Sequence, residues 1–357
     1  MSSPLSYIAA VVPEPKAGHV VRSRALETLG SGEISIRITA TAINPVDWKM
    51  RDYDAFITEY PAILGSDAAG QVAAVGSDVS DFEPGDRVFF QGIIGNYASS
   101  TFQQYCKMPA ALVSKTPKNI SDEQAAGVSL ATMAVVTAFY SEEGQGLIPP
   151  WKTGGEQAGT KAAIVILGGA SSVGQYAIQL ARLSGFERII TNASTSNHTF
   201  LRSLGAHVVL DRNTSDAQSF AAEVGDLPLA FVFDAISGKS TQTLGVEILQ
   251  NTKSPSNQLV TVHVVRPESI DADAVALAES REPKVVIKQV LGIGSSPGLR
   301  YLSEPMAREL GGENGYLARG LLTPNRPLVV SGGLDAVDEA LSLNKAGVSG
   351  QKVIVCP

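Results

Sequence analysis

The sequence contains few of the residues that build disulfide frameworks and metal sites, with two cysteines and four histidines in 357 residues. Two cysteines are too few for a disulfide framework, a four-thiolate zinc lobe or an iron–sulfur cluster. Cysteine poverty is typical of reducing compartments, so we predict a cytoplasmic location and no structural metal. The histidines show no metal-ligand spacing and are interpreted as surface or packing residues: His19, His198, His207 and His263.

Long hydrophobic runs and basic clusters are also missing. The longest apolar runs, such as Ala162–Leu167, fall far short of the roughly 18 to 20 residues of a membrane helix. The amino terminus lacks a basic region and its apolar patch meets Pro13, so we predict a first strand there rather than a secretory signal. With 28 Lys+Arg against 35 Asp+Glu, the net charge is −7. We therefore predict a soluble chain without a membrane or nucleic-acid partner.

What the sequence does contain is an ordinary globular composition, with 44% hydrophobic and 18% charged residues, and a surplus of glycine, at 34 residues. Its length predicts roughly two domains. Short β-type runs separated by Gly and Pro occupy the first 125 or so residues and predict a mostly antiparallel β domain. These runs are Tyr7–Val12, Glu33–Ile43, Gly70–Val75 and Arg87–Phe90.

From Lys161 the pattern changes to alternating strands and helices. Repeated units of this kind predict a parallel sheet with helices on both faces, hence a Rossmann-like domain. The expected helices are Val173–Ser184 and Phe200–Leu204. The expected strands are Lys161–Leu167, Arg188–Ala193, His207–Leu210, Leu229–Asp234, Gln258–Val265 and Val285–Val290.

A glycine-rich turn connects the first of these strands to the helix that follows it. Gly169 and Gly174 occupy the first and third glycine positions of the dinucleotide fingerprint G-x-G-x-x-G, and Ser171 occupies the middle one. Such a turn lets backbone amides and a helix N-terminus approach a pyrophosphate. The alternative is a plain turn whose small residues serve packing. We predict cofactor contacts from Gly169, Ala170, Ser171, Ser172, Val173 and Gly174.

The end of the second strand bears on which dinucleotide binds. NAD sites usually place a carboxylate there for the ribose 2′-hydroxyl, and such a group would repel a 2′-phosphate. The segment 191–198 holds no carboxylate. We predict NADPH, with its phosphate held by Ser194, Ser196, His198 and Arg212. The alternative is that these polar residues cap the following helix.

Several motifs in order give the chain a resemblance to the medium-chain dehydrogenase/reductase superfamily over essentially its whole length. They are Asn44–Lys49 (NPVDWK), Gly65–Gly70 (GSDAAG), Val75–Gly76, Pro84–Val88 (PGDRV), the turn Gly168–Gly174 and Ser349–Lys352 (SGQK). The chain looks like the zinc-free quinone-oxidoreductase and enoyl-reductase branch, particularly fungal chaperonin-10-like or trans-acting enoyl reductases.

The resemblance implies an α/β protein of two domains. A mostly β, chaperonin-10-like catalytic domain would comprise residues 1–128 and 298–357. A Rossmann dinucleotide-binding domain would comprise residues 129–297, with the nicotinamide lying between the two.

Two departures from the zinc-dependent members are informative. Asn44 stands where those enzymes have a Cys and Ser66 where they have a His, although the following acid is kept as Asp67. Amide and hydroxyl groups are poor zinc ligands beside thiolate, imidazole or carboxylate. We therefore predict no catalytic metal.

Without a metal, the substrate must be activated by its own conjugation. Hydride can add to an enal, enone, enoyl thioester or quinone because charge spreads onto an oxygen that hydrogen-bond donors hold. Candidate donors are Lys49, Tyr53 and Tyr60, and we predict Tyr53 and Lys49 as the catalytic pair on the strength of the resemblance. The alternatives are a packed aromatic, a surface charge, and a proton supplied by water.

The resemblance also implies cofactor contacts outside the glycine turn. These are Asn44, Pro45, Ala235, Ile236, Leu291 and Lys352, with Thr132 or Thr137 near the carboxamide. Specificity is expected from the loops Arg51–Tyr60, Gln91–Thr101, Gly144–Thr160 and Ser295–Tyr316.

Other functions stay open at this point. The chain could serve a polyketide synthase as a trans-acting enoyl reductase that meets an acyl-carrier domain, or reduce carbonyl groups without a metal. It could also bind a cofactor without performing chemistry. The substrate is expected to be small, hydrophobic and conjugated, and the protein a monomer or homodimer.

Overall fold

A computed structural model of the chain describes residues 6–262 and 270–357. The chain forms two compact units, one of Met1–Leu130 with Ile293–Pro357 and the other of Ala131–Gly292. After the domains predicted from the sequence, we call them the catalytic unit and the dinucleotide unit. Their boundaries lie at 130/131 and 292/293, against the predicted 128/129 and 297/298.

The dinucleotide unit is built on a six-stranded parallel sheet in the order β11-β10-β9-β12-β13-β14. This order is that of a doubly wound nucleotide-binding fold, so the predicted Rossmann-like class is confirmed. The strands are β9 (Ala163–Leu167), β10 (Arg188–Ala193), β11 (Val208–Asp211), β12 (Leu229–Asp234), β13 (Gln258–Val262) and β14 (Val286–Val290). The end of the predicted strand Gln258–Val265, together with His263, lies outside the described residues.

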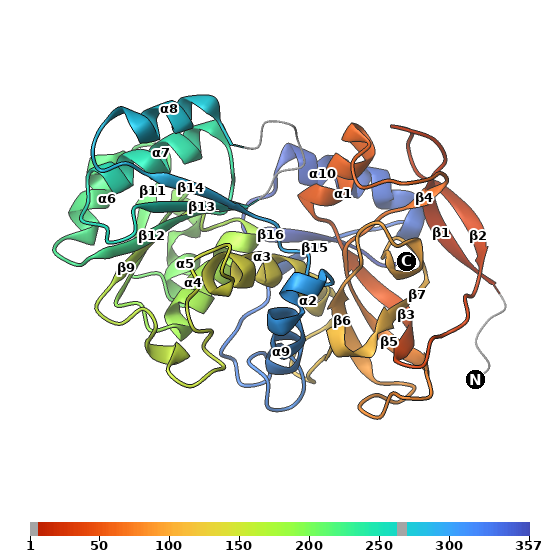
Figure 1. Ribbon diagram of the computed structural model, residues 1–357. Helices are drawn as coiled ribbons and strands as arrows, with labels where there is room; N and C mark the ends of the chain where they lie inside the picture. The colour runs from red at the N-terminus through yellow and green to blue at the C-terminus, as the bar shows by residue number, and fades with distance from the viewer. Residues whose placement is uncertain (1–5, 263–269) are drawn as a thin grey trace. The chain divides into compact units, whose positions relative to one another are not determined.

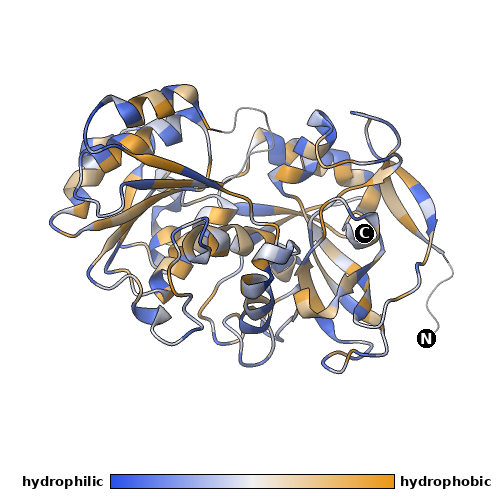
Figure 2. Ribbon diagram, in the orientation of Figure 1, coloured by the Kyte–Doolittle hydropathy of each residue, from blue (hydrophilic) through white to orange (hydrophobic). Residues whose placement is uncertain are grey.

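Helices cover both faces of this sheet. The helices are α3 (Ser129–Tyr140), α4 (Ser172–Leu183), α5 (His198–Leu204), α6 (Ala217–Val224), α7 (Lys239–Gln250) and α8 (Ala272–Ser280). Figure 1 shows α6, α7 and α8 together on one side and α4 and α5 on the other. Because both faces are covered, all five residues of β9 are buried, which explains its unbroken apolar run. Figure 2 shows the same contrast, with orange strands and helices of mixed colour.

The catalytic unit is mostly β, as predicted. One sheet runs β2-β1-β4, and a larger one runs β15-β16-β3-β5-β6-β8 with β7 also paired to β3. The C-terminal strand β16 pairs with β3, so the chain returns to complete the sheet that its first part began. The strands are β1 (Ser6–Val12), β2 (Val20–Ala25), β3 (Glu33–Ala42), β4 (Ala62–Ile63), β5 (Asp67–Val75), β6 (Arg87–Gln91), β7 (Tyr105–Pro109), β8 (Val113–Lys115), β15 (Arg326–Val330) and β16 (Gln351–Val355).

The helices of the catalytic unit are α1 (Pro45–Tyr53), α2 (Asp122–Ala125), α9 (Arg300–Leu310) and α10 (Val337–Ala346). Residues Ser295–Tyr316 were predicted to be a loop, but helix α9 lies within them, with Pro305 inside the helix. The helix is nevertheless amphipathic, with Leu302, Met306 and Leu310 buried at i, i+4 and i+8. Among the described residues, no helix has both the length and the apolar character needed to cross a membrane.

Candidate active site

The glycine turn of the dinucleotide unit is shaped so that its glycines admit no side chain. A Cβ on Gly169 would lie 2.2 Å from the Thr191 hydroxyl oxygen, and one on Gly174 would lie 2.3 Å from the Gly168 carbonyl oxygen. Gly168 itself has a positive φ of 79°. The backbone is therefore packed as closely as the dinucleotide fingerprint requires.

Hydrogen bonds fix the direction of the amides in this turn. The Asn192 side-chain oxygen accepts from the Gly168 N–H at 2.9 Å, and the Asn192 carbonyl accepts from Gly169 at 3.2 Å. Ser171 is the N-cap of the twelve-residue helix α4 and accepts from the Gly174 N–H at 3.0 Å. A rigid turn at the start of a helix is a suitable cradle for an anionic pyrophosphate. The remaining turn residues, Ala170, Ser172 and Val173, are half-buried.

The predicted phosphate-binding residues gather partly at the end of β10. The Ala193 carbonyl accepts from the His198 ring nitrogen Nε2 at 3.2 Å and from the Arg212 N–H at 3.1 Å. Ser194 and Ser196 follow directly, and the Ser194 side chain makes no capping hydrogen bond. Capping therefore does not account for Ser194.

A second turn, after β12, lies against the glycine turn. The Asp234 carboxylate accepts from the N–H groups of Ile236 and Ser237, and the exposed Ile236 side chain occupies the space beside Gly168. Burial raises the pKa of Asp234 to about 6. Ala235 is buried in this turn.

Two other predictions concern the same unit. Leu291, directly after β14, is 36% exposed. Of the two threonines expected near the carboxamide, Thr137 donates to the Met133 carbonyl, whereas the buried Thr132 hydroxyl has no hydrogen-bond partner in the part of the chain that the structure describes. Thr132 is thus the one whose hydroxyl stays uncommitted.

The loop Gly144–Thr160 was expected to contribute to specificity. It packs at the amino ends of the strands, where the Gly159 N–H donates to the Ser184 carbonyl and a Cβ on Gly185 would lie 2.3 Å from the Glu156 carbonyl oxygen. The glycine turn lies at the carboxyl ends. The expectation was wrong for this loop, because the opposite end of a doubly wound sheet binds ligands.

In the catalytic unit, Asn44 and Ser66 belong to a buried polar cluster; these are the two positions where the zinc-dependent enzymes have metal ligands. The Asn44 amide nitrogen approaches the Ser66 oxygen at 3.4 Å, and the Ser66 hydroxyl donates to Asp47 at 2.7 Å. The other Asp47 oxygen accepts from the Asn44 backbone N–H at 2.7 Å, which secures the start of α1. Burial raises the pKa of Asp47 to about 7, although these hydrogen bonds and the Lys352 charge oppose the shift.

Lys352 and Asp67 complete this cluster. The Lys352 ammonium donates to the Asn44 side-chain oxygen at 2.5 Å. Asp67 is fully buried and accepts from the Leu130 N–H at 3.2 Å. Burial raises the pKa of Asp67 and lowers the pKa of Lys352, while the attraction between the two opposes both shifts. We refer to Asn44, Asp47, Ser66, Asp67 and Lys352 as the buried cluster.

The predicted catalytic pair lies on α1, which starts at the buried cluster. Lys49 is buried, with its ammonium nitrogen 5.3 Å from the centre of the Trp48 ring, and Tyr53 is 50% exposed with its ring 6.3 Å from that of Trp48. Their i, i+4 spacing puts both on one side of the helix. The Tyr60 hydroxyl instead donates to Asp54 at 2.6 Å; burial and this bond raise its pKa. Pro45 is exposed at the first position of α1.

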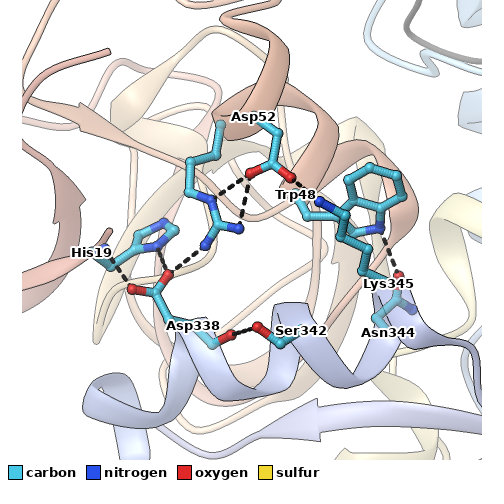
Figure 3. A network of polar contacts seen from close by, with 8 residues as sticks. His19, Trp48, Asp52, Asp338, Ser342, Asn344 and Lys345 are labelled. Carbon is cyan, nitrogen blue, oxygen red and sulfur yellow. Dashed lines mark hydrogen bonds and ion pairs between the residues drawn. The ribbon is translucent and has the colours of Figure 1, made fainter. Parts of the chain in front are cut away.

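A polar network that the sequence did not reveal joins α1 to α10 (Figure 3). Asp338 accepts from the Arg51 guanidinium and from the His19 ring, both at 2.7 Å. Farther along, Lys345 pairs with Asp52 at 2.6 Å and the Trp48 indole donates to Asn344 at 3.1 Å (Figure 3). These residues lie about 300 positions apart in the chain, so no local pattern could have indicated the network.

A doubly wound parallel sheet beside a β-rich unit completed by the C-terminal strand is the architecture of a two-domain dehydrogenase or reductase. The family model of the alcohol dehydrogenase GroES-like domain matches residues 30–118. The chain is 30% identical over 330 residues to the trans-enoyl reductase himH of Aspergillus japonicus, covering 90% of this chain and 89% of that one. It is also 30% identical over 375 residues to the trans-enoyl reductase tndF of Aspergillus flavipes, covering 97% and 98%.

A solved structure from Rhizobium etli, described as a zinc-dependent alcohol dehydrogenase protein, is 25% identical, with a TM-score of 0.77 over 99% of this chain and 98% of that one. The chain belongs to the medium-chain dehydrogenase/reductase superfamily, in its enoyl-reductase branch. It is an oxidoreductase of a family whose reductases use a nicotinamide cofactor.

Proposed function

We propose that the protein is an NADPH-dependent, metal-independent reductase that transfers hydride to a C=C bond activated by conjugation, in an enal, enone or enoyl thioester, or to a quinone. One observation carries the proposal. The chain has both a glycine turn that suits a pyrophosphate and a hydrogen-bonded cluster, with Asn44 and Ser66, at the positions where zinc-dependent relatives have metal ligands. The curated relatives named as trans-enoyl reductases support the same reaction.

The glycine turn suits the cofactor, since its glycines leave no side chain to keep a pyrophosphate away and since Asn192 braces the turn through the N–H groups of Gly168 and Gly169. A reduced nicotinamide, when bound, supplies the hydride. Ser171, Ser172 and the amino end of α4 would hold the pyrophosphate. Ile236, Leu291 and Thr132 would contact the rest of the dinucleotide.

The preference for NADPH rests on the end of β10. The His198 ring and the Arg212 backbone N–H both bond to the Ala193 carbonyl, and Ser194 follows it directly in the chain. The imidazole, the guanidinium and the hydroxyl of these residues are groups that suit a phosphate. A carboxylate, which would repel that phosphate, is absent from positions 191–198 of the sequence.

The substrate would be activated by hydrogen bonding rather than by a Lewis acid. In the buried cluster, Asn44 and Ser66 bond to Lys352 and Asp47 and offer an amide and a hydroxyl, which are poor zinc donors. Tyr53 and Lys49 would hold the oxygen on which charge develops, and one of them would return a proton.

The experiment is a turnover assay with the pure protein. NADPH or NADH is mixed with enals, enones, quinones, enoyl thioesters and, as a control, simple ketones, and loss of reduced-nicotinamide absorbance is followed. We expect turnover of conjugated acceptors with NADPH and not of simple ketones. Reduction of ketones alone would make it a carbonyl reductase, and cofactor binding without any turnover would contradict an enzymatic role.

The names of the relatives favour a second experiment, which tests whether the enoyl thioester is presented on an acyl-carrier domain of a polyketide synthase. The same thioester is offered on a carrier domain and on a small thiol such as N-acetylcysteamine. A trans-acting reductase is expected to turn over the carrier-bound form with much higher kcat/KM. Equal rates would indicate a stand-alone reductase.

A further inference from the structure

Lys352 is a lysine almost wholly inside the catalytic unit. It is 4% exposed on β16, and its stem passes over Gly127, where a Cβ would lie 2.8 Å from the Lys352 Cγ. An ammonium group is costly to bury unless opposite charge and hydrogen bonds compensate. Gly127 leaves space for this side chain, and the buried ammonium needs opposite charge and hydrogen bonds from its neighbours.

The compensation comes from two fully buried carboxylates. From Lys352 a chain of hydrogen bonds runs through the Asn44 side chain and the Ser66 hydroxyl to Asp47. Asp67 is attracted to the same ammonium. One Asp67 oxygen accepts from the Leu130 N–H, and the other has no hydrogen-bond partner within 6–262 and 270–357, so the attraction of the Lys352 ammonium is a large part of the compensation.

Asn44 is well suited to the middle of this chain. Its amide oxygen accepts from the ammonium while its amide nitrogen faces the Ser66 oxygen, and its backbone N–H reaches Asp47. A thiol would offer only a weak donor and a weak acceptor, both on one sulfur atom. The residues that the sequence showed only to be poor metal ligands thus have a positive role.

We propose that Lys352 is the internal cation of the buried cluster, a positioning residue that neutralises Asp67 and Asp47 and, through Asn44, fixes the first turn of α1. It does there what a bound metal ion could do for the same carboxylates. Because α1 carries Lys49 and Tyr53, the orientation of the predicted catalytic pair depends on this charge. The inference concerns the stability of one unit and does not rest on the proposed reaction.

This role differs from the cofactor contact that the C-terminal S-G-x-K motif suggested. If Lys352 contacted the cofactor, its removal would lower the affinity for NADPH and leave the cofactor-free protein as stable as before. An internal cation would affect the cofactor-free protein first. The two can therefore be distinguished without any assay of activity.

The test compares Lys352→Met, Asp67→Asn and the double variant with Lys118→Met, whose side chain is 94% exposed, as the surface control. The melting temperature of the cofactor-free protein is measured at pH 8. We expect Lys352→Met to lower it by about 10 °C, since an uncompensated buried carboxylate remains. Adding Asp67→Asn should restore at least half of the loss, and Lys118→Met should change little. Strictly additive effects of the two substitutions would overturn the proposal.

A pH series adds a readout that loss of packing alone would not change. The charged groups facing Lys352 are Asp67 of β5 and Asp47 of α1. Without the ammonium their ionisation becomes costlier, so Lys352→Met should lose more stability than the wild type between pH 5 and pH 8, and the double variant should lose less than Lys352→Met. Parallel slopes would contradict the role. If Lys352→Met does not fold, recovery of folding in the double variant supports the proposal, and its failure to recover refutes it.

The cofactor arm completes the test. NADPH binding is titrated by fluorescence for every variant that folds. A melting temperature unchanged within about 2 °C, with a dissociation constant more than about tenfold higher, would assign Lys352 to the cofactor and refute the internal-cation role.

Discussion

The glycine turn and the buried cluster depend on opposite properties of their residues: the turn on small size, and the cluster on charge and hydrogen-bonding groups. The turn consists of seven consecutive residues, Gly168–Gly174, and depends on the absence of a side chain at its three glycines. The cluster draws Asn44, Asp67 and Lys352 from three distant parts of the chain and depends on what each side chain supplies. A steric requirement within a continuous segment is visible in a sequence, whereas a balance of charge among distant residues is not.

The difference also predicts how each region fails. Adding one carbon should break the turn, and removing one charge should break the cluster. Substitutions that respect these rules should be mild in both.

Gly169→Ala should produce the largest effect. The new Cβ would lie 2.2 Å from the hydroxyl oxygen of Thr191, which is itself fully buried and donates to the Ile166 carbonyl at 2.6 Å. The turn must then shift by an ångström or so, and we expect NADPH affinity to fall by about 1,000-fold. Isothermal titration or fluorescence titration measures it.

Gly238→Ala is the matched control in the same unit. A Cβ there would have its nearest neighbours at 3.8 Å, an ordinary contact, so NADPH affinity should stay within a factor of two or so. Equal losses in the two variants would show that the close contact at Gly169 does not set the affinity.

The same difference explains which features could be predicted from the sequence. The parallel sheet and its turn were predictable because periodicity and glycine spacing are local properties. The positions Asn44 and Ser66 were interpreted from the sequence as departures from a zinc site, and this stays a prediction. The bond between Asn44 and Lys352 could not be foreseen, because it depends on the return of β16 to the sheet. Helix α9 lies inside the predicted loop Ser295–Tyr316; a proline inside a helix is unusual, and the burial of Leu302, Met306 and Leu310 depends on packing against the rest of the unit.

Tyr53→Phe tests whether α1 supplies a proton or a hydrogen bond to the reaction. Removing the hydroxyl should lower kcat by about 100-fold while KM changes little, since general acid catalysis is worth at least that much. Tyr301→Phe is the control, because Tyr301 is equally exposed, at 49% against 50% for Tyr53. Unchanged kcat in Tyr53→Phe would leave Lys49 or water as the proton source.

Asp47→Asn tests the charge balance of the cluster through pH. The pKa of Asp47 is raised from 3.8 to about 7 by burial, so the folded state holds a proton that the unfolded state releases. This contribution is fully present below pH 4 and is lost as pH rises through about 7. Between pH 5 and pH 8 we expect the wild type to lose roughly 2 kcal/mol of unfolding free energy from this group, and Asp47→Asn to lose less.

Urea unfolding at the two pH values measures this difference, with Asp81→Asn as the control for an exposed aspartate. If the wild type and Asp47→Asn show the same pH dependence of stability, Asp47 does not have a raised pKa. The proposed charge balance between Asp47 and Lys352 would then be wrong.

Asp338→Ala tests the outer attachment of α1 and should have the smallest effect. The substitution releases the His19 ring and the Arg51 guanidinium together (Figure 3). Because the Asp338 side chain is 40% exposed, water replaces part of what is lost, and we expect about 1 kcal/mol of destabilisation in urea unfolding. Glu339→Ala, next to it on α10 and exposed, should be neutral. If Asp338→Ala instead proved as damaging as Lys352→Met, α1 would be held by its exposed face as firmly as by its buried start, and the contrast between the buried cluster and the surface network would not hold.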